Sequence, residues 1–166
     1  TATPNAKINY IRNSVKATVD AYNGSVTLYA WDENDPILKT WSKAFPGSVK
    51  AKSEMSAGLV SHVRYPEDMF RVQRDVLSLY HVTNASAFYG GQDFWRVPRD
   101  PSTLGANAGA QPPYFYTLQL PGESKPAFSL TTPFVPRGGR ENLSAFAVVN
   151  SDAGPDYGKF TVLQLQ

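Results

Sequence analysis

The apolar positions of the chain recur first at helical spacing and later at strand spacing. A row at intervals of three and four residues predicts a first helix from Thr3–Pro4 to Asn23–Gly24. The members of this row are Ile8, Ile11, Val15, Val19 and Tyr22. Alternation over 25–31 predicts one strand, Asp35–Pro36 begins a short helix that ends at Pro46–Gly47, and Ser53 begins another that runs to Val63.

The clearest helical pattern lies in the middle of the chain. Tyr65–Pro66 precedes a row of apolar residues with Glu67 and Asp68 in the first turn, where acidic groups suit the helix dipole. This pattern predicts a helix that continues to Tyr80: Met69, Val72, Val76, Leu79 and Tyr80 share one face.

Beyond Tyr80 the pattern is typical of strands joined by turns. The segment 86–89 is predicted as a turn, 94–97 as a short strand and 99–111 as a mobile loop. Two hairpins follow, one pairing 114–120 with 127–135 and the other pairing 144–150 with 159–165. Helices followed by hairpins predict an α+β fold, with N-terminal helices packed on a largely antiparallel sheet in a single domain over 1–166.

Composition narrows the range of partners and compartments. The 166 residues carry a net charge of +2, 42% hydrophobic and 18% charged residues, and no cysteine. This charge is too small and too evenly spread for a nucleic-acid footprint, so nucleic acid is excluded as a partner. The absence of cysteine excludes disulfides and thiolate metal sites. A start at Thr1 and an end on a strand-like run suggest a domain excised from a larger protein.

A cluster of acidic residues is the candidate metal site. Asp32, Glu33 and Asp35 place three carboxylates within four positions, and calcium prefers several oxygen ligands from one loop. Pro36 departs from the helix–loop–helix calcium pattern. The alternative is that Asp35 caps the following helix while Asp32 and Glu33 are solvated turn residues. We therefore expect no cofactor, with calcium as the one metal to test.

Two features are candidate ligand-binding sites. Arg137 and Arg140 flank two glycines, a geometry that can hold a phosphate or carboxylate, although solvation or pairing with Glu141 explains them as well. Trp95 and Tyr114 belong to an aromatic group beside the predicted loop, which suits a saccharide platform or equally a core or an interface. No nucleophile elbow or phosphate loop is present, so no catalytic residue is assigned and a non-enzymatic role is favoured.

Four segments carry a resemblance to a known family: Tyr10–Gly24, Ser61–Phe70, Gln92–Pro98 and Arg140–Leu143. Over most of its length the chain resembles the large bacterial multipass membrane proteins known as uncharacterised protein family 0182. The resemblance implies an extracytoplasmic domain of a protein in the cell membrane, with the remainder of that protein and other envelope components as partners. It implies no reaction, ligand or oligomeric state.

Three functional hypotheses follow for this domain. The first is a non-catalytic role in packing or protein interaction. The second is a binding module for an envelope saccharide or an anionic ligand, and the third is an envelope enzyme.

Overall fold

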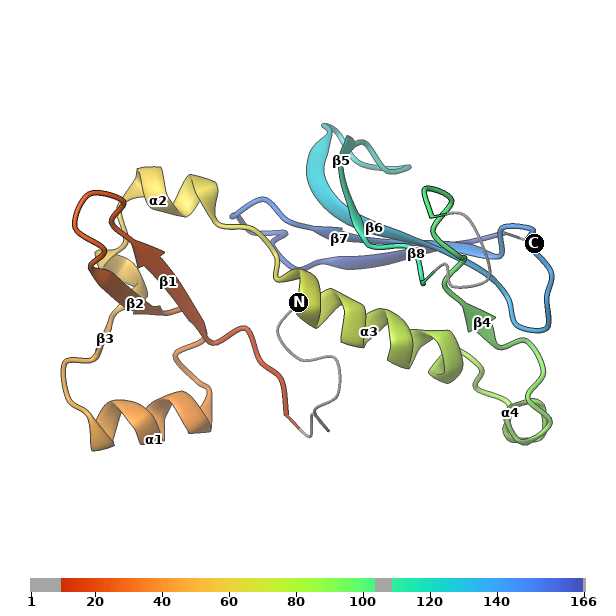
Figure 1. The fold of residues 1–166 in the computed structure, drawn as a ribbon, viewed down its shortest axis with the longest axis horizontal. Coiled ribbons are helices and arrows are strands. Elements are labelled where there is room, and N and C mark those ends of the chain that lie inside the picture. The colour runs from red at the N-terminus through yellow and green to blue at the C-terminus, as the bar shows by residue number, and fades with distance from the viewer. Residues whose placement is uncertain (1–9, 104–108, 166) are drawn as a thin grey trace. The chain divides into compact units, whose positions relative to one another are not determined.

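The computed structural model describes residues 10–103 and 109–165, and it confirms the predicted α+β class. The chain divides into two compact units, Thr1–His62 and Val63–Gln166, which are described separately below. Figure 1 shows the helices and strands of both units. The prediction of one domain over the whole chain stays a prediction.

The first unit is a three-stranded sheet with helices. Its sheet has the order β1-β2-β3, in which β1 and β2 form an antiparallel hairpin and β3 runs parallel to β2. The elements, in chain order, are β1 (Val15–Val19), β2 (Val26–Ala30), α1 (Pro36–Ala44), β3 (Val49–Lys50), a 3₁₀ turn η1 (Lys52–Glu54) and α2 (Ala57–His62).

The predicted first helix is wrong where the structure describes it. Val15–Val19 is a strand, and the predicted start at Thr3–Pro4 with Ile8 lies outside the described residues. The β-branched residues of this segment fit a strand as well as a helix, because Val15, Ala17 and Val19 also alternate with polar residues. Asn23–Gly24 closes a hairpin turn instead of a helix, with Gly24 at a φ of 72° that favours glycine.

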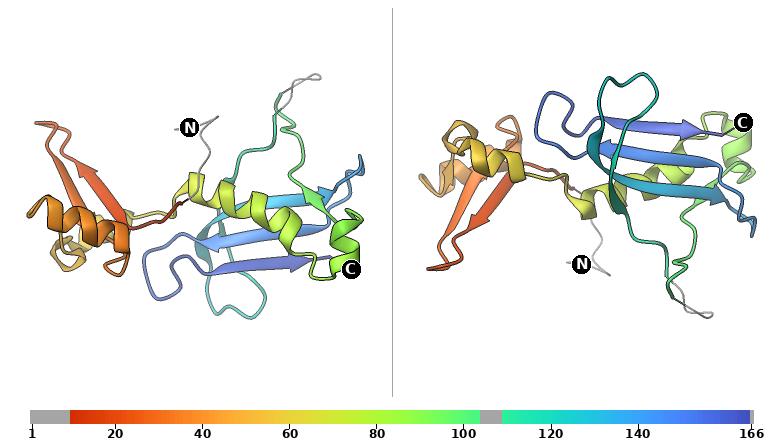
Figure 2. Two further views of the ribbon diagram at one scale, coloured as in Figure 1. Left: turned by 90° about the horizontal axis from the view of Figure 1, so that it is seen from below. Right: turned by 90° about the horizontal axis from the view of Figure 1, so that it is seen from above.

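The second unit is a long helix on an antiparallel sheet. The sheet has the order β4-β6-β7-β8, with β5 paired to the first part of β6. The elements, in chain order, are α3 (Glu67–Tyr80), α4 (Ala85–Tyr89), β4 (Trp95–Arg96), β5 (Tyr114–Leu118), β6 (Ala127–Pro136), β7 (Ala145–Asn150) and β8 (Phe160–Gln164). Figure 2 shows α3 crossing one face of this sheet, with β8 as the outermost strand.

The core of the second unit lies between α3 and the sheet. Phe70 of α3 packs with Leu130 and Val149 of the central strands, and a second cluster surrounds Phe134. The predicted central helix and both predicted hairpins are confirmed. Residues 85–89 form a short helix, whereas a turn was predicted over 86–89. The side chain of Asn84 accepts a hydrogen bond from the Ala87 amide at 3.0 Å and caps this helix.

Candidate functional site

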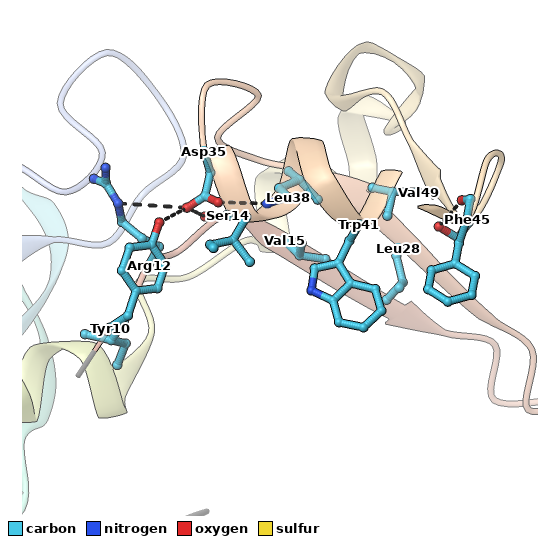
Figure 3. Close-up of a pocket in the computed structure, with 13 residues that line it drawn as sticks. Tyr10, Arg12, Ser14, Val15, Leu28, Asp35, Leu38, Trp41, Phe45 and Val49 are labelled. Carbon is cyan, nitrogen blue, oxygen red and sulfur yellow. Dashed lines mark hydrogen bonds and ion pairs between the residues drawn. The ribbon is translucent and has the colours of Figure 1, made fainter. Parts of the chain in front are cut away.

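The first unit contains an open groove that is lined mostly by apolar side chains. It lies between α1 and the three-stranded sheet and has a volume of about 660 Å³. We call it the α1 groove. Its apolar floor comes from the strands, through Val15, Leu28 and Val49. Figure 3 shows Trp41 of α1 and Phe45, the residue that directly follows α1, beside Leu28 at one end and Asp35 at the other.

The apolar end of the groove is formed by one row of side chains along α1. Ile37 and Trp41 are four residues apart and therefore share one face of α1, and Phe45 directly follows the helix. The rings of Trp41 and Phe45 stack with centroids 5.4 Å apart, yet these side chains remain 58% and 56% exposed. Leu38 is the only residue of α1 that is buried. A helix normally turns its apolar face to a core, whereas the described residues of the first unit leave this row more than half exposed.

The polar end of the groove is organised around Asp35. This carboxylate is only 1% exposed and caps α1 by accepting a hydrogen bond from the Leu38 amide at 2.8 Å. It also accepts hydrogen bonds from the hydroxyl of Tyr10 and, at 2.9 Å, from that of Ser14. The Nε of Arg12 lies 3.9 Å from the carboxylate. Asp35 thus joins the segment before β1 to the start of α1.

These hydrogen bonds keep Asp35 ionised. The Tyr10 hydroxyl first, and the Leu38 amide second, lower the pKa of Asp35 to about 2 because each donates to the charged form. The same contact raises the pKa of Tyr10, since the phenolate would lose its hydrogen bond to the carboxylate. The oxygens of Asp35 are occupied by donors from the protein itself, so the carboxylate has a structural part in the groove.

The three carboxylates of the predicted metal site do not form one cluster. Asp32 and Glu33 line a separate open pocket with Lys52, and Asp32 accepts a hydrogen bond from the Asn34 amide at 3.1 Å. Asp35 instead belongs to the α1 groove. Within residues 10–103 and 109–165, no three histidine or acidic side chains are grouped so that they could hold a metal ion. Calcium binding at these residues stays a prediction.

Trp95 and Tyr114, the two aromatic candidates for ligand binding, lie in different surroundings. Trp95 is 7% exposed, with its ring stacked on His81 at a centroid distance of 3.4 Å and its other neighbour Phe134 at 5.4 Å. It is therefore part of the core. Tyr114 lies in β5, opposite Thr131 and near Tyr116. Since Trp95 pairs with Pro136 on the same long strand, about five residues separate the two aromatics along β6, or roughly 17 Å.

Arg137 and Arg140, the two arginine candidates, differ in whether they line a pocket. Arg140 lines a pocket of about 510 Å³ together with Trp95, His81 and Asn142. Arg137 is not among the residues that line this pocket, and its guanidinium lies 5.8 Å from the ring centre of Phe94. The structure thus brings Trp95 and Arg140 to one pocket and leaves Arg137 and Tyr114 outside it.

The sequence patterns missed the α1 groove, although its signal was present. The row of Ile37, Trp41 and Phe45 predicts the helix correctly, but an apolar row does not say whether anything covers it. The segment of Tyr10 and Ser14 was read as helix, so its hydroxyls were not expected beside Asp35. Only the strand at Val15–Val19 places them there.

The fold and its sites define an α+β region with an exposed apolar groove. The sequence matches the uncharacterised protein family UPF0182 over residues 1–166, and the chain belongs to this family. It is 61% identical over 165 residues to a UPF0182 protein of Thermobifida fusca, covering 99% of this chain and 16% of that protein. It is 53% identical to a UPF0182 protein of Paenarthrobacter aurescens, covering 99% of this chain and 17% of that protein. No solved structure matches the chain.

The relatives are much longer than this chain, which spans about 16–18% of their length. In the part of the chain that the structure describes, no helix has the length and apolar character needed to cross a membrane.

Proposed function

We propose that this chain is a non-catalytic, extracytoplasmic packing region of a larger membrane protein, and that its α1 groove holds another segment of that protein. The resemblance to multipass membrane proteins motivates the location. The groove motivates the role, because its apolar row is exposed in a chain that corresponds to less than a fifth of its relatives.

The observation that carries this proposal is the poor apolar burial of the first unit. Among its described residues, Tyr29, Leu38 and Met55 are the buried apolar side chains, and each retains 7% exposure. Its most deeply buried side chain is the carboxylate of Asp35. A unit of this size has little apolar surface to bury by itself, so a neighbour that covers the groove adds what the unit lacks.

The gain from covering the groove is substantial relative to the stability of a small unit. Complete burial of one large apolar side chain contributes about 1.5–3 kcal/mol. Ile37, Trp41 and Phe45 are each about half exposed, so covering them contributes roughly 2–4 kcal/mol in total. Protein domains are stable by only about 5–15 kcal/mol, so this contribution is a large fraction.

Accessibility in the full-length protein tests the proposal. The chain contains no cysteine, so Trp41→Cys introduces a single thiol into the groove. Tyr22→Cys is the matched control, because Tyr22 is fully exposed in the turn between β1 and β2. We expect a maleimide to label Cys at position 41 at least roughly tenfold more slowly than at 22, since an occupied groove excludes reagent and water. Equal labelling rates in the folded protein contradict the proposal.

A second candidate function is favoured by the pocket of Arg140. Its lining combines a guanidinium with the polar side chains of Asn84 and Asn142, which suits an envelope saccharide or an anionic group. In this case phosphate or an envelope saccharide raises the melting temperature of the chain, and replacing both Arg137 and Arg140 by alanine removes the rise. Arg99→Ala, an exposed arginine outside the pocket, is the control. A rise that survives the double substitution contradicts an anion site at these arginines.

A further inference from the structure

The strand β8 leaves one side of its backbone unpaired at the edge of the sheet. β8 pairs with β7 in the antiparallel direction. The hydrogen bonds donated by the amides of Leu165 and Asn150 join the two strands at either end and show which positions bond to each other. In an antiparallel pair, residues whose backbone groups bond to the neighbouring strand alternate with residues whose backbone groups point away from it. The N–H and C=O groups of Phe160, Val162 and Gln164 therefore point away from β7, and no described strand pairs with them.

The residues of β8 lack the features that usually protect an exposed edge. The strand consists of Phe160, Thr161, Val162, Leu163 and Gln164, with no charge and no proline, and its register with β7 continues without a bulge. Natural proteins discourage unwanted pairing at sheet edges with lysine, proline or bulges. The edge strand of the other sheet shows such a feature, because β1 has Lys16 among its five residues. The composition of β8 instead favours a strand that is paired in the complete protein.

An apolar groove lies beside this edge, on the face that α3 covers. This groove, which we call the α3 groove, has a volume of about 350 Å³ and includes Phe160 of β8 and, from α3, Val72, Val76 and Tyr80. Phe160 turns to this face, where its ring centre lies 5.6 Å from that of Phe70. Val76 and Tyr80 are 52% and 67% exposed. A strand added to β8 would place every second side chain on this same face, next to these exposed residues.

We infer that β8 binds an extended segment of the larger protein, with apolar side chains at alternate positions, as a further strand of the sheet. The backbone groups of Phe160, Val162 and Gln164 supply the hydrogen bonds, and the α3 groove receives the apolar side chains. The relatives contain more than four fifths of their length outside the region that this chain matches, so such a segment has an ample source. The inference shares with the proposed function the premise of packing against the larger protein, but it concerns another surface.

Hydrogen exchange in the full-length protein tests this inference at single residues. The amides of Thr161, Leu163 and Leu165 point to β7 and serve as internal controls that exchange slowly in either case. With a strand added, the outward amides of Phe160, Val162 and Gln164 also exchange slowly, on the order of a hundredfold below the rate of a free edge. An alternating pattern, with the outward amides fast and the inward amides slow, overturns the inference.

A substitution in the groove separates pairing from other causes of protection. We expect Tyr80→Lys to restore fast exchange at the outward amides of β8 while the inward amides stay slow. A charged lysine in the α3 groove disfavours the binding of an apolar side chain there. Tyr89→Lys is the matched control, since Tyr89 is almost fully exposed in α4, outside the groove. Protection that persists in Tyr80→Lys contradicts the part assigned to the α3 groove.

Dilution identifies the source of the added strand. Protection that disappears as the protein concentration falls means that β8 pairs with a second copy, and this result overturns the assignment to a segment of the same chain. Because the readout is confined to β8, it is independent of the labelling of position 41 in the α1 groove. Failure of one proposal therefore leaves the other to be judged by its own measurement.

Discussion

The two units of this chain bury different kinds of side chain. The second unit contains every fully buried apolar residue that the structure describes, with Phe70, Leu130 and Phe134 at its centre. In the first unit the fully buried side chain is the carboxylate of Asp35, while Trp41 and Phe45 remain more than half exposed. The second unit thus has a core of its own, whereas the first unit is held by a hairpin, a capped helix and a polar network.

This difference shows what each unit requires from its surroundings. A core such as that of Phe70 and Leu130 stabilises a fold from within, because the apolar area is already removed from water. A unit whose apolar row faces an open groove reaches the same stabilisation only when a neighbour covers it. The contrast is the physical basis for assigning the packing role to the first unit.

Core truncation has the largest expected effect and directly compares the two units. We expect Phe134→Ala to lower the free energy of unfolding by about 3–5 kcal/mol, because it leaves a cavity beside Trp95 in a closed core. Leu38→Ala in the first unit should cost less, roughly 2 kcal/mol, because Leu38 borders an open groove that water and side chains can fill. Urea unfolding of the chain, followed by tryptophan fluorescence, measures both values. Equal costs for the two substitutions would remove the proposed contrast.

Loss of the hydrogen bonds around Asp35 in the first unit has the next largest expected effect on stability. Asp35→Ala removes the cap of α1 and leaves the hydroxyls of Tyr10 and Ser14 without their acceptor, so we expect the melting temperature to fall by several degrees. Glu33→Ala, which removes an exposed turn carboxylate, is the control and should change the melting temperature little.

The effect of Asp35 has a defined pH dependence. The folded-state pKa of about 2 lies below the ordinary value of 3.8, so the folded protein binds a proton less readily than the unfolded chain. The stabilisation by Asp35 is therefore complete above pH 4 and is lost as the pH falls towards 2. The Asp35→Ala variant should lack this loss, and its melting temperature should depend less steeply on pH in that window. An unchanged slope would show that other carboxylates dominate the acid transition.

Local patterns predicted the central helix and both hairpins of the second unit. The row from Met69 to Tyr80 is long enough to exclude a strand, and the turns at 121–125 and 151–155 separate strands of clear β composition. In the first unit the same reasoning failed over Val15–Val19, because a short segment whose apolar residues fit both a spacing of four and a spacing of two is compatible with both periods. Tertiary pairing with β2 decides the structure there.

The sites were less predictable than the fold for a related reason. Asp35 was recognised as a helix cap, but its contacts with Tyr10 and Ser14 join residues more than twenty positions apart. The role of Trp95 in a ligand platform stays a prediction, and the contacts of its ring with His81 and Phe134 are ones that composition cannot show. Burial depends on what the rest of the chain places around a residue, so an apolar or aromatic pattern predicts an element more reliably than its exposure.

Substitution of Lys16, a half-buried charge in the first unit, has the smallest expected effect on stability. Its ammonium lies 5.5 Å from the ring centre of Trp31, and burial lowers its pKa from 10.5 to about 8. Between pH 8 and 10.5 the unfolded chain therefore holds a proton that the folded chain releases, so stability rises with pH across this window and the penalty is complete below it. We expect Lys16→Met to raise the free energy of unfolding at pH 7 by about 1 kcal/mol, a value reduced for the solvent that screens a half-buried ammonium. It should also remove the rise between pH 8 and 10.5, whereas Lys39→Met, at an exposed lysine of α1, should leave that rise in place. If the Lys16→Met variant keeps the rise, burial does not penalise this charge, and the first unit tolerates a lysine in its interior as readily as it holds the carboxylate of Asp35.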